Sequence, residues 1–250
     1  DKLKLVEMVL MNAKKEHEQK FRLTQRKDDS RYYALKQLAQ LLQCDTHRIE
    51  LFDNSHIQGS SPVGAMVAFI NGEPAKKLYR KFHIEHDEKR DDLLSMKEII
   101  TRHYTRLKNN SKQMPDLILV DGGLIQIKAA SEALNSIEVK IPVFGLYKDD
   151  KHQTRGLMDI DSHTYSFENK SIFFLLTRMQ DEVHRFAISF HKEVRRKAMT
   201  KSIFDSVKGI GRRRREVLEK AFPDINALRN ATIEELQQYL PLDVAIALST

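Results

Sequence analysis

The chain has 250 residues, enough for one large core or for a domain of ordinary size with a small one beside it. Its 41% hydrophobic content is that of a globular rather than a disordered protein, and its formal net charge of +7 indicates an anionic partner. The single cysteine, Cys44, excludes an internal disulfide and a cysteine-rich zinc cluster, so any metal must be held by oxygen or imidazole ligands.

The sequence shows no pattern typical of a membrane protein. No apolar run approaches the roughly 20 residues that a transmembrane helix needs. Residues 1–20 alternate charged and apolar side chains, unlike a secretory signal. We therefore expect a cytoplasmic protein with no membrane partner. Because the chain begins with Asp1 instead of methionine, we also expect it to be a fragment of a longer protein.

The N-terminal part predicts a helix followed by three strands. Residues 1–45 are expected to form a helical lead-in, because apolar residues recur there at helical spacing. The segment IELFD then predicts a strand with Ile49 and Asp53 on one face, ending at that acid. A β-hairpin follows, and its turn is expected at Asn71 and Gly72 because this pair tolerates positive φ.

The middle of the chain alternates helices and strands. The run DLILV is apolar on both faces, which predicts a central strand with Asp121 at its end. The segment IPVFGLY predicts another strand, and a polar excursion over 148–163 follows it. Apolar residues at helical spacing predict helices over 91–107, 124–134 and 169–201.

The predicted order of elements, β-β-β-α-β-α-β-α, is that of an RNase H-like mixed sheet with flanking helices. In that topology the fourth strand lies parallel beside the first, so the strands that end in Asp53 and Asp121 are expected to be neighbours. After about residue 201 short helices joined by tight turns predict a small all-α domain. The fold class is therefore α/β with an all-α addition. The expected domains are a lead-in over 1–45, the sheet domain over 46–200 and a helix-hairpin-helix domain over 201–250.

Asp53 and Asp121 form a candidate metal site at the shared strand ends. Mg²⁺ or Mn²⁺ takes hard oxygen ligands, and such a cation promotes phosphodiester hydrolysis by activating water and neutralising charge on the phosphate. Two carboxylates at a poorly solvated sheet end also repel each other unless a cation lies between them. The residues leave open the alternative that each aspartate only caps the turn after its strand.

The long helix contributes a third candidate. In MQDEVHRFAISFHKEV the apolar stripe faces the core, and His184 lies on a neighbouring stripe. The last helix of an RNase H-like domain brings a third group over the strand-end acids, and a histidine there can accept or deliver a proton. His184 is the expected third catalytic residue, and Asp181, Glu182 and His191 are weaker candidates. The alternative is an ordinary surface histidine.

Two basic segments are candidates for DNA binding. In VKGIGRRRREV a tight turn precedes a helix whose N-terminal amides can hold a phosphate, and the arginines add positive charge. Such a helix-hairpin-helix turn contacts the backbone rather than the bases, so binding should not depend on sequence. The second segment is AKKLYRKFHI, whose basic residues could follow a DNA backbone across the sheet face. The alternatives are a simple turn for the first segment and an ordinary half-exposed strand for the second. The candidate DNA-binding residues are Gly209, Ile210, Gly211, Arg212, Arg213, Arg214, Arg80 and Lys81.

The chain resembles the UvrC family of bacterial nucleotide excision repair nucleases. The resemblance rests on RIELFDNSHIQG, DLILVDGG, RMQDEVHRFAISFH and KGIG, four blocks in order that together span most of the chain. It implies the C-terminal half of a metal-dependent endonuclease that cuts duplex DNA 5′ to a lesion. It also implies that Asp53, Asp121 and His184 match the family's catalytic triad, and that UvrB, loaded by UvrA, is a partner through the parent protein.

One departure from the family concerns its second helix-hairpin-helix motif. Pro241, Leu242 and Asp243 stand where the family usually has a glycine turn, so phosphate binding there is not expected. The family's N-terminal nuclease lies outside this sequence, which leaves at most one of the two incisions to it. Two other interpretations stay open: a DNA-binding scaffold without catalysis of its own, and a nuclease of similar fold that cuts structured RNA.

Overall fold

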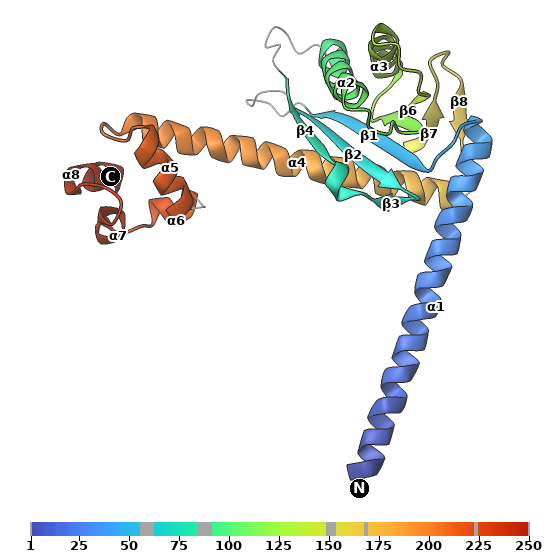
Figure 1. Cartoon of the computed structure of the whole chain (residues 1–250), viewed down its shortest axis with the longest axis horizontal. Coiled ribbons are helices and arrows are strands. Elements are labelled where there is room, and N and C mark those ends of the chain that lie inside the picture. The colour runs from blue at the N-terminus through green and yellow to red at the C-terminus, as the bar shows by residue number, and fades with distance from the viewer. Residues whose placement is uncertain are drawn as a thin grey trace. The chain divides into compact units, whose positions relative to one another are not determined.

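The chain divides into two units, Asp1–Ala187 and Ile188–Thr250, in the computed structural model shown in Figure 1. Helix α4 (Lys170–Ser206) supplies residues to both units. Within the ranges that the structure describes, no helix combines the length and apolarity that a bilayer crossing needs. The described residues are 2–55, 63–84, 92–148, 154–167, 170–222 and 225–249.

The first unit is built on one mixed sheet. Its strands are β1 (Arg48–Ser55), β2 (Val63–Ile70), β3 (Glu73–Pro74), β4 (Arg80–His83), β5 (Leu117–Val120), β6 (Val143–Lys148), β7 (Thr154–Met158) and β8 (Thr164–Ser166). Their order is β3-β2-β1-β5-β6-β7-β8, and β4 also pairs with β2. Because β1 pairs antiparallel with β2 and parallel with β5, the predicted RNase H-like arrangement is confirmed.

Local sequence explains the central strands. β5 is buried at every position, as expected of a strand with parallel neighbours on both sides. Between β2 and β3, Asn71 and Gly72 have φ values of 50° and 73°, the positive values of the predicted hairpin turn. β1 ends at Ser55 rather than at Asp53, because its last residues continue to pair with β2 after the β5 ladder has ended.

The interpretation of residues 148–163 as a polar excursion is wrong for 154–163, the part of it that the structure describes beyond β6. β7 and the turn to β8 lie there, and these two strands extend the sheet beyond β6 in antiparallel fashion. The sequence of β7 is TRGLM, in which Thr154, Gly156 and Leu157 are buried. A threonine and a glycine at buried positions leave little hydrophobic alternation, which is the signal used to recognise a strand.

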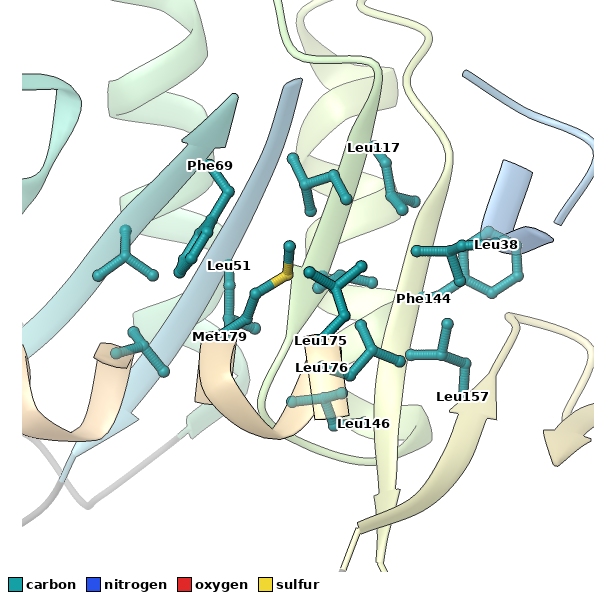
Figure 2. Packing of buried hydrophobic residues seen from close by; sticks show 14 of the residues in the cluster. Leu38, Leu51, Phe69, Leu117, Phe144, Leu146, Leu157, Leu175, Leu176 and Met179 are labelled. Carbon is teal, nitrogen blue, oxygen red and sulfur yellow. The ribbon is translucent and has the colours of Figure 1, made fainter. Parts of the chain in front are cut away.

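Helices cover both faces of the sheet (Figure 1). Besides α4 they are α1 (Lys2–Leu42), α2 (Asp92–Asn109) and α3 (Leu124–Ser136), and a short 3-10 turn η1 (Lys76–Leu78) precedes β4. α2 and α3 cover one face, whereas α4 and the end of α1 cover the other. On the α4 face, Leu175, Leu176 and Met179 pack onto the strands (Figure 2). Each such buried side chain stabilises the fold by about 1.5–3 kcal/mol.

Glu50 is a fully buried carboxylate on the face covered by α2. It accepts hydrogen bonds from the Tyr104 hydroxyl at 2.6 Å and the Arg48 guanidinium at 2.5 Å, and Nε2 of His103 lies 3.2 Å away. Burial disfavours its charged form, yet the hydrogen bonds from His103 and Tyr104 leave the pKa of Glu50 below its ordinary value. The charge is therefore fully paired, which is the condition for keeping it inside.

Cys44 follows α1 and is half-buried. Burial, together with the negative charges of Asp45 and Asp116, raises the pKa of its thiol to about 11. A thiol with that pKa is almost entirely protonated near neutral pH, so it is a weak nucleophile.

The second unit is helical throughout its described part. Its short helices enclose a core that includes Phe204, Leu218 and Leu236. The helix that begins at Ile233 has a capping box, in which Thr232 and Glu235 each accept a backbone N–H of the other. Besides the end of α4, its helices are α5 (Arg212–Ala221), α6 (Ile225–Arg229), α7 (Ile233–Gln237) and α8 (Leu242–Ser249).

Gly145 of β6 lies where the backbone after β5 approaches closely. A Cβ there would lie 2.3 Å from the carbonyl oxygen of Gly122. We expect Gly145→Ala to lower the free energy of unfolding by about 1–3 kcal/mol, measured by urea denaturation. At Gly123, the N-cap of α3, a Cβ would meet nothing within 4 Å, so Gly123→Ser should stay within about 0.5 kcal/mol of wild type. An equal loss in both variants would contradict the steric explanation.

Candidate active site

Asp53 and Asp121 lie side by side on adjacent parallel strands. The ladder between β1 and β5 ends at the pair Phe52 and Val120, and the two aspartates come next. The backbone N–H of Asp121 donates to the carbonyl oxygen of Phe52 at 2.8 Å, which holds the two strand ends together. Because alternate residues of a strand share a face, both carboxylates lie on the face that α4 covers.

α4 brings His184 over the two carboxylates. Val183 is fully buried against the sheet, so the next residue lies at the flank of the helix, beside the strand ends. Nε2 of His184 lies 2.5 Å from Oδ2 of Asp121 and 3.9 Å from Oδ2 of Asp53. One potential ligand atom from each of the three residues lies within 4.8 Å of the others. The structure thus brings together the three residues predicted to be catalytic.

Two further residues that the sequence reasoning missed surround Asp121. Nζ of Lys148, the last residue of β6, lies 2.8 Å from its Oδ1, and Gln180 Nε2 donates to the same oxygen at 2.8 Å. Lys148 ends the third parallel strand in the row, so the strand-end rule that selected the aspartates applies to it as well. Gln180 lies four residues before His184, a spacing that places both on one flank of the helix.

The charges of the site follow from burial and hydrogen bonding. Burial disfavours the ionised form of Asp121, but donors from His184 and Lys148 outweigh it and lower its pKa to about 2. The hydrogen bond to Asp121 raises the pKa of His184, against the opposing effect of burial. Near neutral pH Asp121 is therefore a carboxylate, and its hydrogen bond to His184 stabilises the protonated form of the imidazole.

The donor set fits a divalent cation that prefers oxygen. The side chains of Asp53 and Asp121 are only 9% and 4% exposed, so their charges are poorly screened by water. Carboxylate oxygens are the ligands that Mg²⁺ and Mn²⁺ prefer. The His184 side chain is 43% exposed, which leaves it accessible to a substrate as well as to the carboxylates.

The weaker candidates on α4 do not join this cluster. Glu182 accepts hydrogen bonds from the Tyr79 hydroxyl and from the Arg185 guanidinium, on the flank of the helix away from Asp121. Asp181 is exposed. The side chain of His191 lies outside the described residues.

Arg80 and Lys81 lie on opposite faces of the sheet. Lys81 pairs with Ala65, which belongs to the core under α4, whereas Arg80 pairs with Met66, which belongs to the core under α2. The Lys81 ammonium lies 5.5 Å from the ring centroid of Phe186 on α4. The Arg80 guanidinium donates to nearby backbone carbonyls. One DNA-binding surface on a single face of the sheet therefore cannot include both.

The predicted glycine turn of the second unit leads into α5. Gly209 has a φ of 104°, and a Cβ there would lie 2.9 Å from Cγ2 of Val244, so the position requires glycine. Ile210 is buried in the core of the unit. Gly211 is the N-cap of α5, and a Cβ there would meet nothing within 4 Å. The N-terminal amides of α5 are consequently open to close approach.

The three arginines at the start of α5 differ in their partners. Arg212 pairs with Glu216 at 3.1 Å, and Arg214 donates to the carbonyl oxygen of Gly209 at 2.7 Å. Arg213 is exposed, and its guanidinium has no hydrogen bond or ion pair with the described part of the chain. All three arginines line a groove with the turn and with Tyr239.

A family model and relatives of similar sequence point to the same protein family. The family described as the UvrC RNase H endonuclease domain matches residues 36–188. The chain is 46% identical over 254 residues to UvrABC system protein C of Streptococcus equi subsp. zooepidemicus and of Streptococcus equi subsp. equi, covering 99% of this chain. It spans only 43% of those relatives. Among solved structures, the catalytic domain of human endonuclease V is 16% identical with a TM-score of 0.30, covering 48% of this chain and 60% of that one, a likeness too weak to carry any conclusion.

We expect Asp121→Asn to lower the pKa of His184, because the hydrogen bond and the negative charge that raise it are both weakened. The imidazole can be titrated by NMR in the presence of EDTA. Since the folded-state pKa is raised, the contribution of His184 to stability is full below its unfolded pKa and is lost as pH rises through the raised value. Asp181→Asn, on the same helix, is the control. An unchanged or higher pKa in Asp121→Asn would contradict the assignment.

Proposed function

The chain belongs to the UvrC family, and from that premise we propose that it makes the incision 5′ to a DNA lesion in nucleotide excision repair. The reaction is hydrolysis of a phosphodiester bond in duplex DNA, in the cytoplasm. UvrB, loaded on the damaged DNA by UvrA, is the partner through the whole protein. The observation that carries the proposal is the convergence of Asp53, Asp121 and His184 where the central strands β1 and β5 of an RNase H-like sheet end.

Asp53 and Asp121 are the residues that would hold Mg²⁺ or Mn²⁺. When bound, such a cation supplies a more acidic water and offsets the negative charge that develops on the phosphate. The chain's own residues prepare the site for it, because parallel pairing of β1 with β5 fixes the spacing of the two carboxylates. Lys148 adds positive charge at the same edge, which reduces the repulsion that an approaching phosphate meets.

His184 is assigned to proton transfer. Its ring is partly exposed, so it can reach a substrate while Asp121 holds it in place. The hydrogen bond to Asp121 raises the pKa of His184 and so stabilises the protonated ring. We therefore assign it delivery of a proton to the oxygen that leaves the phosphorus.

The Ile188–Thr250 unit is proposed to hold the DNA backbone. The amides at the open N-terminus of α5 and the exposed guanidinium of Arg213 both suit a phosphate. Contacts of this kind do not read bases, so binding is expected to be independent of sequence. The turn before α8 is not included, because Asp243 in the first turn of that helix would repel a phosphate.

We expect Asp53→Asn and Asp121→Asn each to reduce 5′ nicking at least about 100-fold, since the amide keeps the shape of the side chain and removes its charge. The assay is Mn²⁺-dependent nicking of a lesion-containing duplex preloaded with UvrA and UvrB, with the N-terminal half of the protein supplied separately. Asp181→Asn should nick like the wild type.

Nicking by Asp121→Asn at the wild-type rate would contradict the active site. Absence of nicking even by the wild-type chain, with DNA still bound, would favour a scaffold over a nuclease. Cutting of a matched RNA duplex in preference to DNA would replace the proposed substrate with RNA.

We expect Arg213→Ala to weaken DNA binding, and to do so by about the same factor for duplexes of different sequence. Loss of one phosphate contact should also reduce the slope of log K against log salt concentration by about 0.9. Fluorescence anisotropy at several KCl concentrations measures both quantities. Lys220→Ala, in the last turn of the same helix, removes an equal charge away from the glycine turn and should change the slope less. Equal slopes for the two variants would contradict a specific role for Arg213.

A further inference from the structure

The carboxylate of Asp121 is held by a buried chain of hydrogen bonds that begins on β7. Oγ1 of Thr154 lies 2.5 Å from Oε1 of Gln180, and Nε2 of Gln180 lies 2.8 Å from Oδ1 of Asp121. Thr154 is 7% exposed and Gln180 is 8% exposed. The proposed chemistry of Asp53, Asp121 and His184 uses neither residue.

The hydrogen bonds from Thr154 to Gln180 and from Gln180 to Asp121 can run in only one direction. An ionised carboxylate can only accept hydrogen bonds, so Gln180 must present its NH₂ group to Asp121. The amide oxygen of Gln180 then faces β7, where only a donor can satisfy it. The hydroxyl of Thr154 is that donor, and it leaves neither end of the buried amide unpaired.

The direction of these hydrogen bonds determines how Asp121 presents its two oxygens. Oδ1 accepts from Gln180 and lies near Lys148, whereas Oδ2 faces His184. A partial rotation of the carboxylate would move its oxygen away from the amide and break the bond to Gln180. The buried amide, unlike the partly exposed Lys148, has little freedom to follow such a rotation.

We propose that Thr154 and Gln180 are positioning residues, which orient the Asp121 carboxylate for a divalent cation. Hydrogen bonds to a metal ligand fix its orientation, and their loss typically weakens metal binding about 10–100-fold. This inference rests on the proposed function, because it takes Asp121 to be a cation ligand.

α4 also provides a matched control for these two residues. Thr177 lies three residues before Gln180, and its hydroxyl is buried without a hydrogen-bond partner in the described part of the chain. Replacing that hydroxyl with a methyl group removes no hydrogen bond. Thr177→Val therefore reports the effect of the same substitution outside the hydrogen bonds that join Thr154, Gln180 and Asp121.

The test measures Mn²⁺ affinity by the EPR signal of the free ion, together with 5′ nicking of loaded DNA. Gln180→Met keeps the size of the side chain and should weaken Mn²⁺ binding about 10-fold. Thr154→Val should weaken it by a smaller factor, and Thr154→Ser, which keeps the hydroxyl, should restore it. Thr177→Val should bind Mn²⁺ like the wild type. Thermal unfolding of each variant checks that the fold is retained, and Thr154→Val keeps the test decisive if Gln180→Met does not fold.

The double variant tests whether the two residues act in series. Because Thr154 acts through Gln180, Thr154→Val combined with Gln180→Met should bind Mn²⁺ no more weakly than Gln180→Met alone. If the two losses of Mn²⁺ affinity multiply in the double variant, Thr154 does not act through Gln180 and the proposal is overturned. Wild-type affinity in both single variants would overturn it too, while leaving the cation site in place. Absence of Mn²⁺ binding by the wild type would overturn the cation site, and with it this inference.

Discussion

The parallel pairing of β1 with β5 is the constraint on which the site of the first unit depends. It places Asp53 and Asp121 next to each other, where their negative charges repel. Asp121 is surrounded by donors: Lys148 and Gln180 contact one of its oxygens, and His184 contacts the other. The same concentration of negative charge that makes this site costly to fold suits it to a divalent cation.

Glu50 shows the opposite treatment of a buried acid. Its carboxylate is enclosed under α2 by three donors and has no path to solvent or substrate, so it serves the fold alone. Asp121 is almost as buried, yet one of its partners, His184, is 43% exposed and so links the carboxylate to solvent. α4 buries Val183 against the sheet and presents His184 at its flank, so core packing fixes where the histidine lies.

The parts of the site that depend on strand ends and helix stripes could be predicted, because those patterns are local in sequence. In that way the sequence predicts that Asp53, Asp121 and His184 come together, as they do in the structure. It does not predict the hydrogen bond between Thr154 and Gln180, since this bond depends on a contact between β7 and α4 that no local pattern indicates. β7 itself was missed because its buried positions include a threonine and a glycine, and hydrophobic periodicity does not register either of them.

The protonated state of Cys44 determines how the chain can be labelled. Maleimides react with thiolates, and a thiol with a pKa of about 11 carries far less thiolate at neutral pH than an exposed cysteine. A cysteine introduced on the surface of either unit would therefore be coupled to a dye in preference to the native one. Dye pairs with one member on each unit would report, by energy transfer, whether the separation between the units changes when DNA is added, with Cys44 left in place.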